Sequence, residues 1–171
     1  MQTDHSRLFD DVSSKRLIIT GAGSGIGLAL VKLALEDGAK IAALSFKDED
    51  RENLNALLPS RHIIHADLSR TVEVEKAMHE AVACLGGVDL FAGIAGQFTH
   101  EAGLNTSLDQ WEKTLALNLT ANFISAKTIG HHLVHQQKGV MCFASSQIGI
   151  VGHPRAAAYA SSKAGLNGLV K

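Results

Sequence analysis

Short apolar runs alternate with longer segments of helical periodicity along the whole chain, and this alternation limits the possible folds more than any other feature. The apolar runs are Arg16–Thr20, Lys40–Ser45, Arg61–Ala66, Asp89–Ala92 and Gly139–Ser145. None of them alternates clearly between apolar and polar residues, which is typical of strands that are covered on both faces. Strands that are separated by helices pair in parallel through right-handed crossovers. We therefore predict an α/β fold with a doubly wound parallel sheet.

The segments between these runs have the spacing of amphipathic helices and end at recognisable stop signals. Glycine or proline follows the first three of them, at Gly38, Pro59 and Gly86, and Ser107 is the expected N-cap of the fourth. The predicted helices are Leu28–Glu36, Asp48–Leu58, Ser69–Leu85, Leu104–Gln136 and Arg155–Lys171. We see no internal repeat or linker. The expectation is one domain over residues 15–171, preceded by a polar N-terminal extension at residues 1–14.

Composition excludes several classes of protein. The 171 residues are 46% hydrophobic, which is enough for a packed core and argues against disorder. Sixteen basic and 17 acidic side chains give a net charge of −1, whereas a protein that coats nucleic acid or anionic lipid needs a basic surplus. No apolar run approaches the roughly 18 residues of a membrane span, and the acidic N-terminal segment does not look like a secretory signal.

Cys84 and Cys142 lie in apolar segments and form no CxxC motif. We therefore expect buried, reduced thiols and a cytoplasmic protein. Nine histidines include the pair His131 and His135, but no carboxylate or cysteine lies nearby in sequence to complete a metal shell. We expect no metal site.

A glycine cluster, TGAGSGIG at Thr20–Gly27, directly follows the first strand and opens the first helix. At this point a parallel sheet presents helix amides to the pyrophosphate of a dinucleotide. The spacing is G-x-x-x-G-x-G, from Gly21, Gly25 and Gly27, and differs from the GxGxxG fingerprint. A glycine-rich turn without a ligand is the alternative, but the position between strand and helix favours a binding loop.

A second group of residues has the character of a catalytic site. Tyr159, the only tyrosine, precedes Lys163 by four residues, so both side chains share one face of a helix. An interfacial tyrosine beside a solvated lysine is the alternative for this pair taken alone. Ser145 and Ser146 end the fifth apolar run, at the edge where such sheets bind ligands. Asn118 lies in an apolar helical stretch, where an unpaired amide would be unfavourable, and a structural role is the alternative there.

Taken together, the glycine loop, the mid-chain asparagine, a serine 13 residues before a tyrosine and the YxxxK pair resemble the short-chain dehydrogenase/reductase family. The resemblance runs from about Lys15 to Lys171 and implies a Rossmann-like fold. It implies that Tyr159 is the general acid or base, and that Lys163 lowers the tyrosine pKa and holds the nicotinamide ribose. Ser146 would orient the substrate oxygen, while Asn118 would interrupt its helix and hold a water in a proton relay.

The implied activity is hydride transfer between NAD or NADP and a ketone or secondary alcohol, with the cofactor supplying the hydride and the protein one matched proton donor. A non-catalytic dinucleotide-binding or interaction protein that retains the fold is the alternative. The resemblance also implies a homodimer or homotetramer, in which Leu104–Gln136 and the Tyr159 helix form a two-fold interface.

The residues that the resemblance assigns to the cofactor lie at the ends of successive strands and on the Tyr159 helix. They are Gly21, Ser24, Gly25, Ile26, Gly27, Ser45, Lys47, Asp67, Leu68, Ala95, Gly96, Tyr159 and Lys163. Asp67 would lie against the adenine ring. An acid at the end of the second strand would select NAD through the ribose 2′-hydroxyl, but Ser45 stands there and Lys47 follows. We therefore lean slightly towards NADP.

The sequence departs from the family pattern in two places. Gly93-Ile94-Ala95-Gly96 stands where the family has Asn-Asn-Ala-Gly, and the sequence ends at Lys171, before the sixth strand that the family adds. The fifth strand would then form an open edge, at which the side chains of Met141, Cys142 and Phe143 lie. One reading is therefore that the sequence is a fragment of a longer enzyme. For the chain as written we expect weak dinucleotide binding and little or no turnover.

Overall fold

All five predicted strands form one parallel sheet. The computed structural model describes residues 12–171, and its sheet has the strand order β3-β2-β1-β4-β5. Every neighbouring pair is parallel, as the doubly wound architecture requires. The strands are β1 (Arg16–Thr20), β2 (Lys40–Ser45), β3 (Ile63–His65), β4 (Leu90–Gly93) and β5 (Val140–Phe143). The predicted Rossmann-like fold is confirmed.

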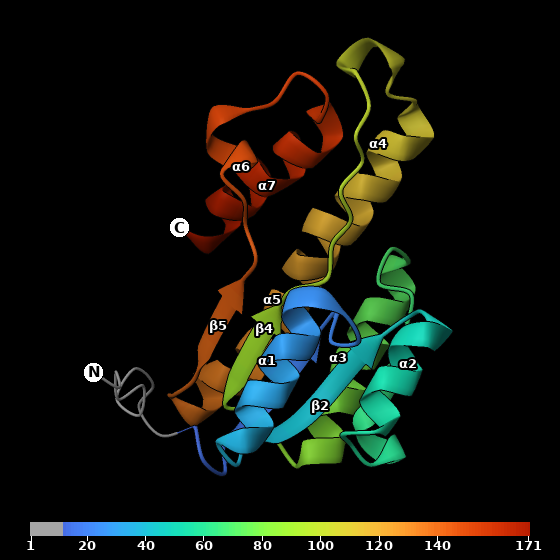
Figure 1. The fold of residues 1–171 in the computed structure, drawn as a ribbon. Coiled ribbons are helices and arrows are strands. Elements are labelled where there is room, and N and C mark those ends of the chain that lie inside the picture. Colours follow the sequence, from blue (N-terminus) through green and yellow to red (C-terminus); the bar gives the residue numbers. More distant parts are fainter. Residues whose placement is uncertain (1–11) are drawn as a thin grey trace, which may run out of the picture.

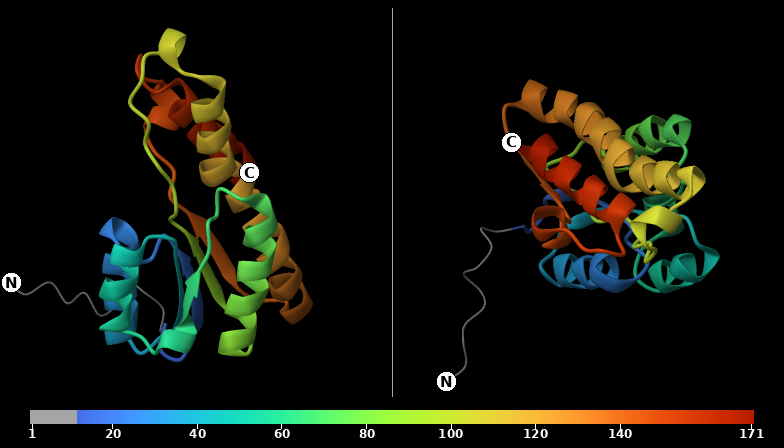
Figure 2. Two further views of the ribbon diagram at one scale, coloured as in Figure 1. Left: turned by 90° about the vertical axis from the view of Figure 1, so that its right-hand side faces the viewer. Right: turned by 90° about the horizontal axis from the view of Figure 1, so that it is seen from above.

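Helices cover both faces of this sheet (Figures 1 and 2). One face carries α1 and α2, and the other carries α3 and α5. The remaining helices, α4, α6 and α7, lie beyond the carboxyl ends of β4 and β5 (Figure 1). The bounds are α1 (Gly25–Glu36), α2 (Asp48–Asn55), α3 (Thr71–Leu85), α4 (Leu108–Leu115), α5 (Ala121–Gln136), α6 (Ile148–Val151) and α7 (Ala157–Val170).

The apolar character of the strands follows from two separate cores. Leu17 and Ile19 of β1 belong to the core beneath α1 and α2, whereas Ile18 between them belongs to the core beneath α3 and α5. Successive side chains of a strand point to opposite faces, so a strand between two cores is apolar at every position.

The predicted helix Leu104–Gln136 is in fact divided. Gly103–Asn105 is a single 3₁₀ turn, and α4 begins only after Ser107. The predicted N-cap is confirmed, because Ser107 Oγ accepts the Gln110 N–H at 3.2 Å and the Gln110 side chain accepts the Ser107 N–H. A π-helical turn, η4 (Ala116–Thr120), then separates α4 from α5 and contains Asn118, where the interruption was expected.

Strand β5 is the edge of the described sheet, and only part of it is uncovered. Val140 is 60% exposed and Cys142 is exposed. Met141 and Phe143 instead pack against the core beneath α3 and α5, with the Phe143 ring centroid 5.7 Å from that of Phe91. These two side chains are half-buried although they lie on the edge strand, because α5 covers their face of it. The expectation that both cysteines are buried was wrong, since Cys84 is half-buried.

The observed boundaries of other elements differ from the predicted ones by a few residues. Strand β3 begins only at Ile63, because Ser60–His62 forms a 3₁₀ turn, and α2 ends at Asn55 before Pro59. The short helix α6 was not predicted. Most of the expected N-terminal extension, residues 1–11, lies outside the described residues. Among the helices within residues 12–171, none is long and apolar enough to cross a membrane.

An ion pair joins the start of β1 to the segment that enters β4. Two guanidinium nitrogens of Arg16 donate to the two carboxylate oxygens of Asp89, each at 2.9 Å, and the Arg16 backbone N–H donates to the same carboxylate. A third guanidinium nitrogen donates to the Gly86 carbonyl at 2.8 Å. Because the carboxylate accepts these bonds, the pKa of Asp89 lies well below its usual range. The stabilisation is present above the unfolded-state pKa, near pH 4, and is lost as the pH falls below it.

Replacing the carboxylate should therefore lower stability in a pH-dependent way. We expect Asp89→Asn to reduce the free energy of unfolding at pH 7 by about 1–3 kcal/mol, because charge-assisted bonds to a half-buried group are lost. The difference from wild type should narrow below about pH 4. Urea unfolding at several pH values measures it. Asp109→Asn is the control, because Asp109 pairs with Lys113 on the exposed surface, where such pairs contribute about 0–1 kcal/mol. Equal losses in the two variants would contradict the assignment.

Candidate functional site

The glycine loop between β1 and α1 is shaped by close backbone contacts. A Cβ at Gly21 would lie 2.8 Å from Cα of Ala95, and one at Gly27 would collide with the Gly21 carbonyl oxygen. Thr20 Oγ1 accepts the N–H groups of Ile94 and Ala95, each at 3.1 Å, and so ties the end of β1 to the segment after β4. This hydroxyl braces the central strands, although the sequence lacks the two asparagines that the family places there.

The loop leaves the N-terminus of α1 open towards the sheet edge. Gly25 has φ +50°, and apart from its chain neighbours and the backbone of its own helix no described atom lies within 4 Å of the Cβ that another residue would place there. Within the described chain, Ser24 makes no side-chain capping bond and the first turn of α1 holds no acidic residue. The free amides and the positive end of the helix dipole therefore suit an anionic group.

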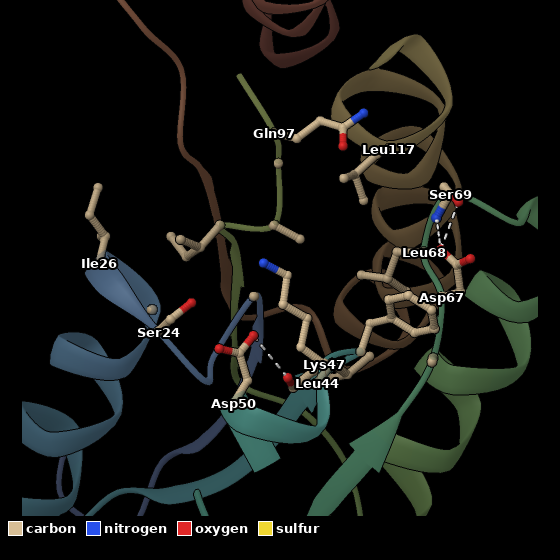
Figure 3. A pocket seen from close by; sticks show the side chains of 18 residues that line it. Ser24, Ile26, Leu44, Lys47, Asp50, Asp67, Leu68, Ser69, Gln97 and Leu117 are labelled. Carbon is tan, nitrogen blue, oxygen red and sulfur yellow. Dashed lines mark hydrogen bonds between the residues drawn. The ribbon is translucent and has the colours of Figure 1, made fainter. Parts of the chain in front are cut away.

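A first cleft of about 570 Å³ runs along the carboxyl ends of the strands beside this loop (Figure 3). Its volume falls within the range of small-molecule sites. Most of the residues predicted to bind a cofactor line it, namely Gly21, Ser24, Ile26, Gly27, Ser45, Lys47, Asp67, Leu68, Ala95 and Gly96. The structure thus gathers residues from the ends of β1, β2, β3 and β4 around one space.

A second, smaller cleft of about 210 Å³ continues from the first one. The two share Ile26, Ile94, Gly96 and Gln97, so they form one groove across the sheet edge. The second cleft adds other residues, namely Phe98, Ala144, Ser145, Tyr159 and Lys163. The glycine loop and the YxxxK pair, far apart in the sequence, therefore lie on the same groove.

Lys163 lines the second cleft and is fixed there by a backbone carbonyl. Its Nζ atom donates to the Ala144 carbonyl at 2.6 Å and lies 5.6 Å from the centroid of the Tyr159 ring. The residue is 4% exposed, and burial lowers its pKa from the usual lysine value. Helix α7 supplies both side chains, as the spacing predicted.

Asn118 ties the segment after β4 to α7. Its Oδ1 atom accepts the Gln97 N–H at 2.9 Å, and its Nδ2 atom donates to the Gln97 carbonyl and to Ser162 Oγ, at 2.9 and 3.1 Å. Its own carbonyl accepts a bond from Asn122 Nδ2 at 2.9 Å. The side chain is fully buried, and Ser162 directly precedes Lys163. The amide thereby holds Gln97, on the groove, against the helix that carries Lys163.

The structure places Ser146 just outside the groove. Ser146 Oγ accepts the Ile148 N–H at 3.3 Å at the start of α6 and, within the described residues, lines neither cleft. Its neighbour Ser145 lines the second cleft and donates to Asn167 Oδ1 at 2.6 Å. The role expected for Ser146 stays a prediction.

Sequence reasoning missed several residues of the groove, among them Asp50 and Phe98. Asp50 lines the first cleft, where its carboxylate lies 3.4 Å from Ser45 Oγ. Asp50 is the third acidic residue in the first turn of α2, and acidic residues are common at that position of any helix. The only sequence signal for a place in the cleft was its separation of five residues from Ser45. Phe98 meets the Tyr159 ring edge to face, with centroids 4.9 Å apart.

No three histidine, cysteine, aspartate or glutamate side chains within residues 12–171 lie close enough together to hold a metal ion. His131 and His135 project from the end of α5, where both are exposed. The described part of the chain therefore offers no residues to assign to a metal.

Removing the Asn118 amide should be more damaging than removing its neighbour. In Asn118→Ala the Gln97 N–H and carbonyl and Ser162 Oγ all lose a partner, so we expect the free energy of unfolding to fall by about 2–4 kcal/mol. Asn122→Ala, the matched control, removes one bond to the Asn118 carbonyl and should lose about 1–2 kcal/mol. Urea unfolding compares the two. An Asn118→Ala loss no larger than that of the control would contradict this account of the network.

Comparison with known proteins agrees with this geometry. A model of the short chain dehydrogenase family matches residues 15–171. The NAD-dependent glycerol dehydrogenase of Listeria innocua is 29% identical over 157 residues, which are 91% of this chain and 62% of that protein. A probable galactose dehydrogenase of Rhizobium meliloti is 31% identical over 171 residues, with coverage of 97% and 67%.

Among solved structures, the crystal structure of gox2181 superposes with a TM-score of 0.82 at 25% identity, over 91% of this chain and 63% of that one. The chain thus spans roughly three fifths to two thirds of the length of the proteins that it matches. The family match covers almost the whole sequence, and the chain therefore belongs to the short chain dehydrogenase family.

Proposed function

We propose that this chain carries the dinucleotide site and the proton-transfer residues of an NAD(P)-dependent oxidoreductase that interconverts a ketone and a secondary alcohol. The observation that carries the proposal is the continuous groove that joins the glycine loop to Tyr159 and Lys163. Relatives named as dehydrogenases of glycerol, galactose and D-threitol support alcohol chemistry.

The residues of the groove fit a nicotinamide dinucleotide. The open N-terminus of α1, with Gly25, would hold the pyrophosphate. Asp67 and Leu68 would lie at the adenine end, and Lys163 would hold the ribose at the nicotinamide end. When bound, the nicotinamide supplies or accepts the hydride.

The protein's own part in the reaction is the handling of a proton. The Tyr159 hydroxyl would donate a proton to the carbonyl oxygen in reduction and take it back in oxidation. The ammonium group of Lys163, held by the Ala144 carbonyl, lies beside the ring and supports this exchange. Ser146 would orient the substrate oxygen, and Asn118 would hold the water that links Lys163 to solvent.

Both signs of charge line the adenosine end of the groove. Lys47, whose side chain points into the first cleft (Figure 3), is the group on which the slight lean towards NADP rests, because its ammonium could approach a 2′-phosphate. Asp50 lines the same cleft with the opposite charge. The end of β2 itself holds no acid, but α2 brings the carboxylate of Asp50 to the same end of the cleft.

Tyr159→Phe tests the proposal. The ring and its contact with Phe98 remain, while the proton donor is lost, so we expect kcat/KM for ketone reduction to fall by about 10²–10⁴-fold. Dinucleotide affinity should change little. Steady-state kinetics of the full-length protein, together with calorimetric titration of NADH and NADPH, provides both measurements.

A Tyr159→Phe variant that keeps more than about a tenth of wild-type activity would show that the proton comes from another group. Dinucleotide binding without turnover of any carbonyl or alcohol by the wild-type full-length protein would favour the non-catalytic alternative.

Self-association in the cytoplasm belongs to the same proposal. Phe123 of α5 is 51% exposed, and Val134 of α5 and Val170 of α7 are also exposed apolar side chains. A two-fold dimer through these helices would cover apolar surface of this kind. We expect light scattering of the full-length protein to give a dimer or tetramer, and Phe123→Asp to shift the mass towards the monomer. A monomeric wild type at concentrations of tens of micromolar would refute it.

A further inference from the structure

Asp50 is a charged group of the first cleft to which the proposed reaction assigns no part. We infer that its carboxylate selects the cofactor, by accepting a hydrogen bond from the 2′-hydroxyl of the adenosine ribose and repelling a 2′-phosphate. The inference rests on the proposed dinucleotide site and assigns it to NAD in preference to NADP.

The carboxylate of Asp50 lies where a dinucleotide fold needs an acceptor. Ser45, the last residue of β2, is 7% exposed and donates its hydroxyl to Asp50 Oδ2. In folds of this class an acid at this strand end binds the ribose hydroxyl. Here the strand end supplies only a serine, and the carboxylate comes to the same place from the first turn of α2 (Figure 3). Within residues 12–171 the other oxygen, Oδ1, has no hydrogen-bond partner, and so it remains available to a ligand.

The position of Asp50 is fixed by contact with the glycine loop. A Cβ at Gly23 would collide with the Cβ of Asp50, so the backbone of the loop packs directly against this residue. Asn53, one turn further along α2, donates to the Gly23 carbonyl at 3.1 Å. The carboxylate is therefore held between the end of β2 and the loop that would receive the pyrophosphate.

The positive charge of Lys47 does not neutralise the carboxylate of Asp50. No ion pair joins Lys47 to Asp50 within the described residues, although both line the first cleft. Lys47 is exposed on a long flexible side chain, and such surface charges are screened and contribute little. Asp50 is half-buried and short, so its repulsion of a phosphate is screened less. A 2′-hydroxyl would meet an acceptor at this point, whereas a 2′-phosphate would meet a like charge.

The test uses ADP-ribose and its 2′-phosphorylated form, because neither ligand needs the nicotinamide end of the groove. Isothermal titration of the wild-type protein should give ADP-ribose about tenfold tighter binding than the 2′-phosphate. In Asp50→Asn this preference should fall about tenfold, to near equality, because the amide still accepts from a hydroxyl but no longer repels phosphate. Lys47→Ala should weaken the 2′-phosphate a few-fold and leave ADP-ribose nearly unchanged.

Asp48→Asn is the matched control. Asp48 lies in the same first turn of α2 and carries the same charge. It is exposed, and it is not among the described residues that line the first cleft. The preference of Asp48→Asn for ADP-ribose over the 2′-phosphate should differ from that of wild type by less than about twofold, because the charge of Asp48 is screened by solvent. Thermal unfolding of Asp50→Asn should match wild type, since an asparagine oxygen can also accept from Ser45.

The results separate the inference from the proposal beneath it. If both ligands bind and Asp50→Asn leaves their ratio unchanged, or if wild type prefers the 2′-phosphate, the role of Asp50 is overturned and the dinucleotide site stands. A shift in Asp48→Asn as large as that in Asp50→Asn would also overturn it. If neither ligand binds the wild-type protein, both the inference and the proposed function fall.

Discussion

The arrangement of the groove depends on the hydrogen bonds of the buried Asn118 amide. The two apolar cores lie on the faces of the sheet, whereas Tyr159 and Lys163 stand on a helix beyond the sheet edge. That helix is held to the segment after β4 through the bond from Asn118 to Ser162 and the two bonds to Gln97. A polar connection of this kind is directional, and so it fixes position more narrowly than apolar contact does.

A hydrogen bond also allows Lys163 to lie in a buried site. Burial lowers its pKa, so the ammonium loses its proton at a lower pH than an exposed lysine does. The carbonyl of Ala144, the residue directly after β5, accepts a hydrogen bond from the ammonium and so offsets part of the free-energy cost of burying its charge. The residue that directly follows the edge strand thereby contributes a backbone group to the site.

Sequence patterns predicted the parts of the structure that depend on local chemistry. The parallel pairing of the strands follows from the alternation of strands and helices, and the Ser107 cap and the shared face of Tyr159 and Lys163 follow from spacing. Features that depend on a distant neighbour were missed or misplaced. Phe143 is covered because α5 crosses its face of β5, and a one-dimensional pattern does not show which face a helix will cover.

Asp50 illustrates the same limit at the groove. Along the chain it is an ordinary helix-start acid, and it reaches the cleft only because α2 packs against Gly23. The end of β2 supplies only Ser45. The chemistry at this point is shared by two elements, and only their packing brings the hydroxyl and the carboxylate together.

The π-helical turn at Ala116–Thr120 has a consequence for the two helices that it joins. One residue more than a regular α-helical turn rotates everything beyond it by about 100° about the axis. This offset lets α4 contact α7 while α5, continuous with it, contacts α3 and β4. A deletion of one residue within the turn would restore a regular helix and swing the α4 side chains away from α7. The length of this segment therefore sets the rotation of α4 relative to α5. Apart from Asn118, its side chains should tolerate substitution far better than the segment tolerates deletion.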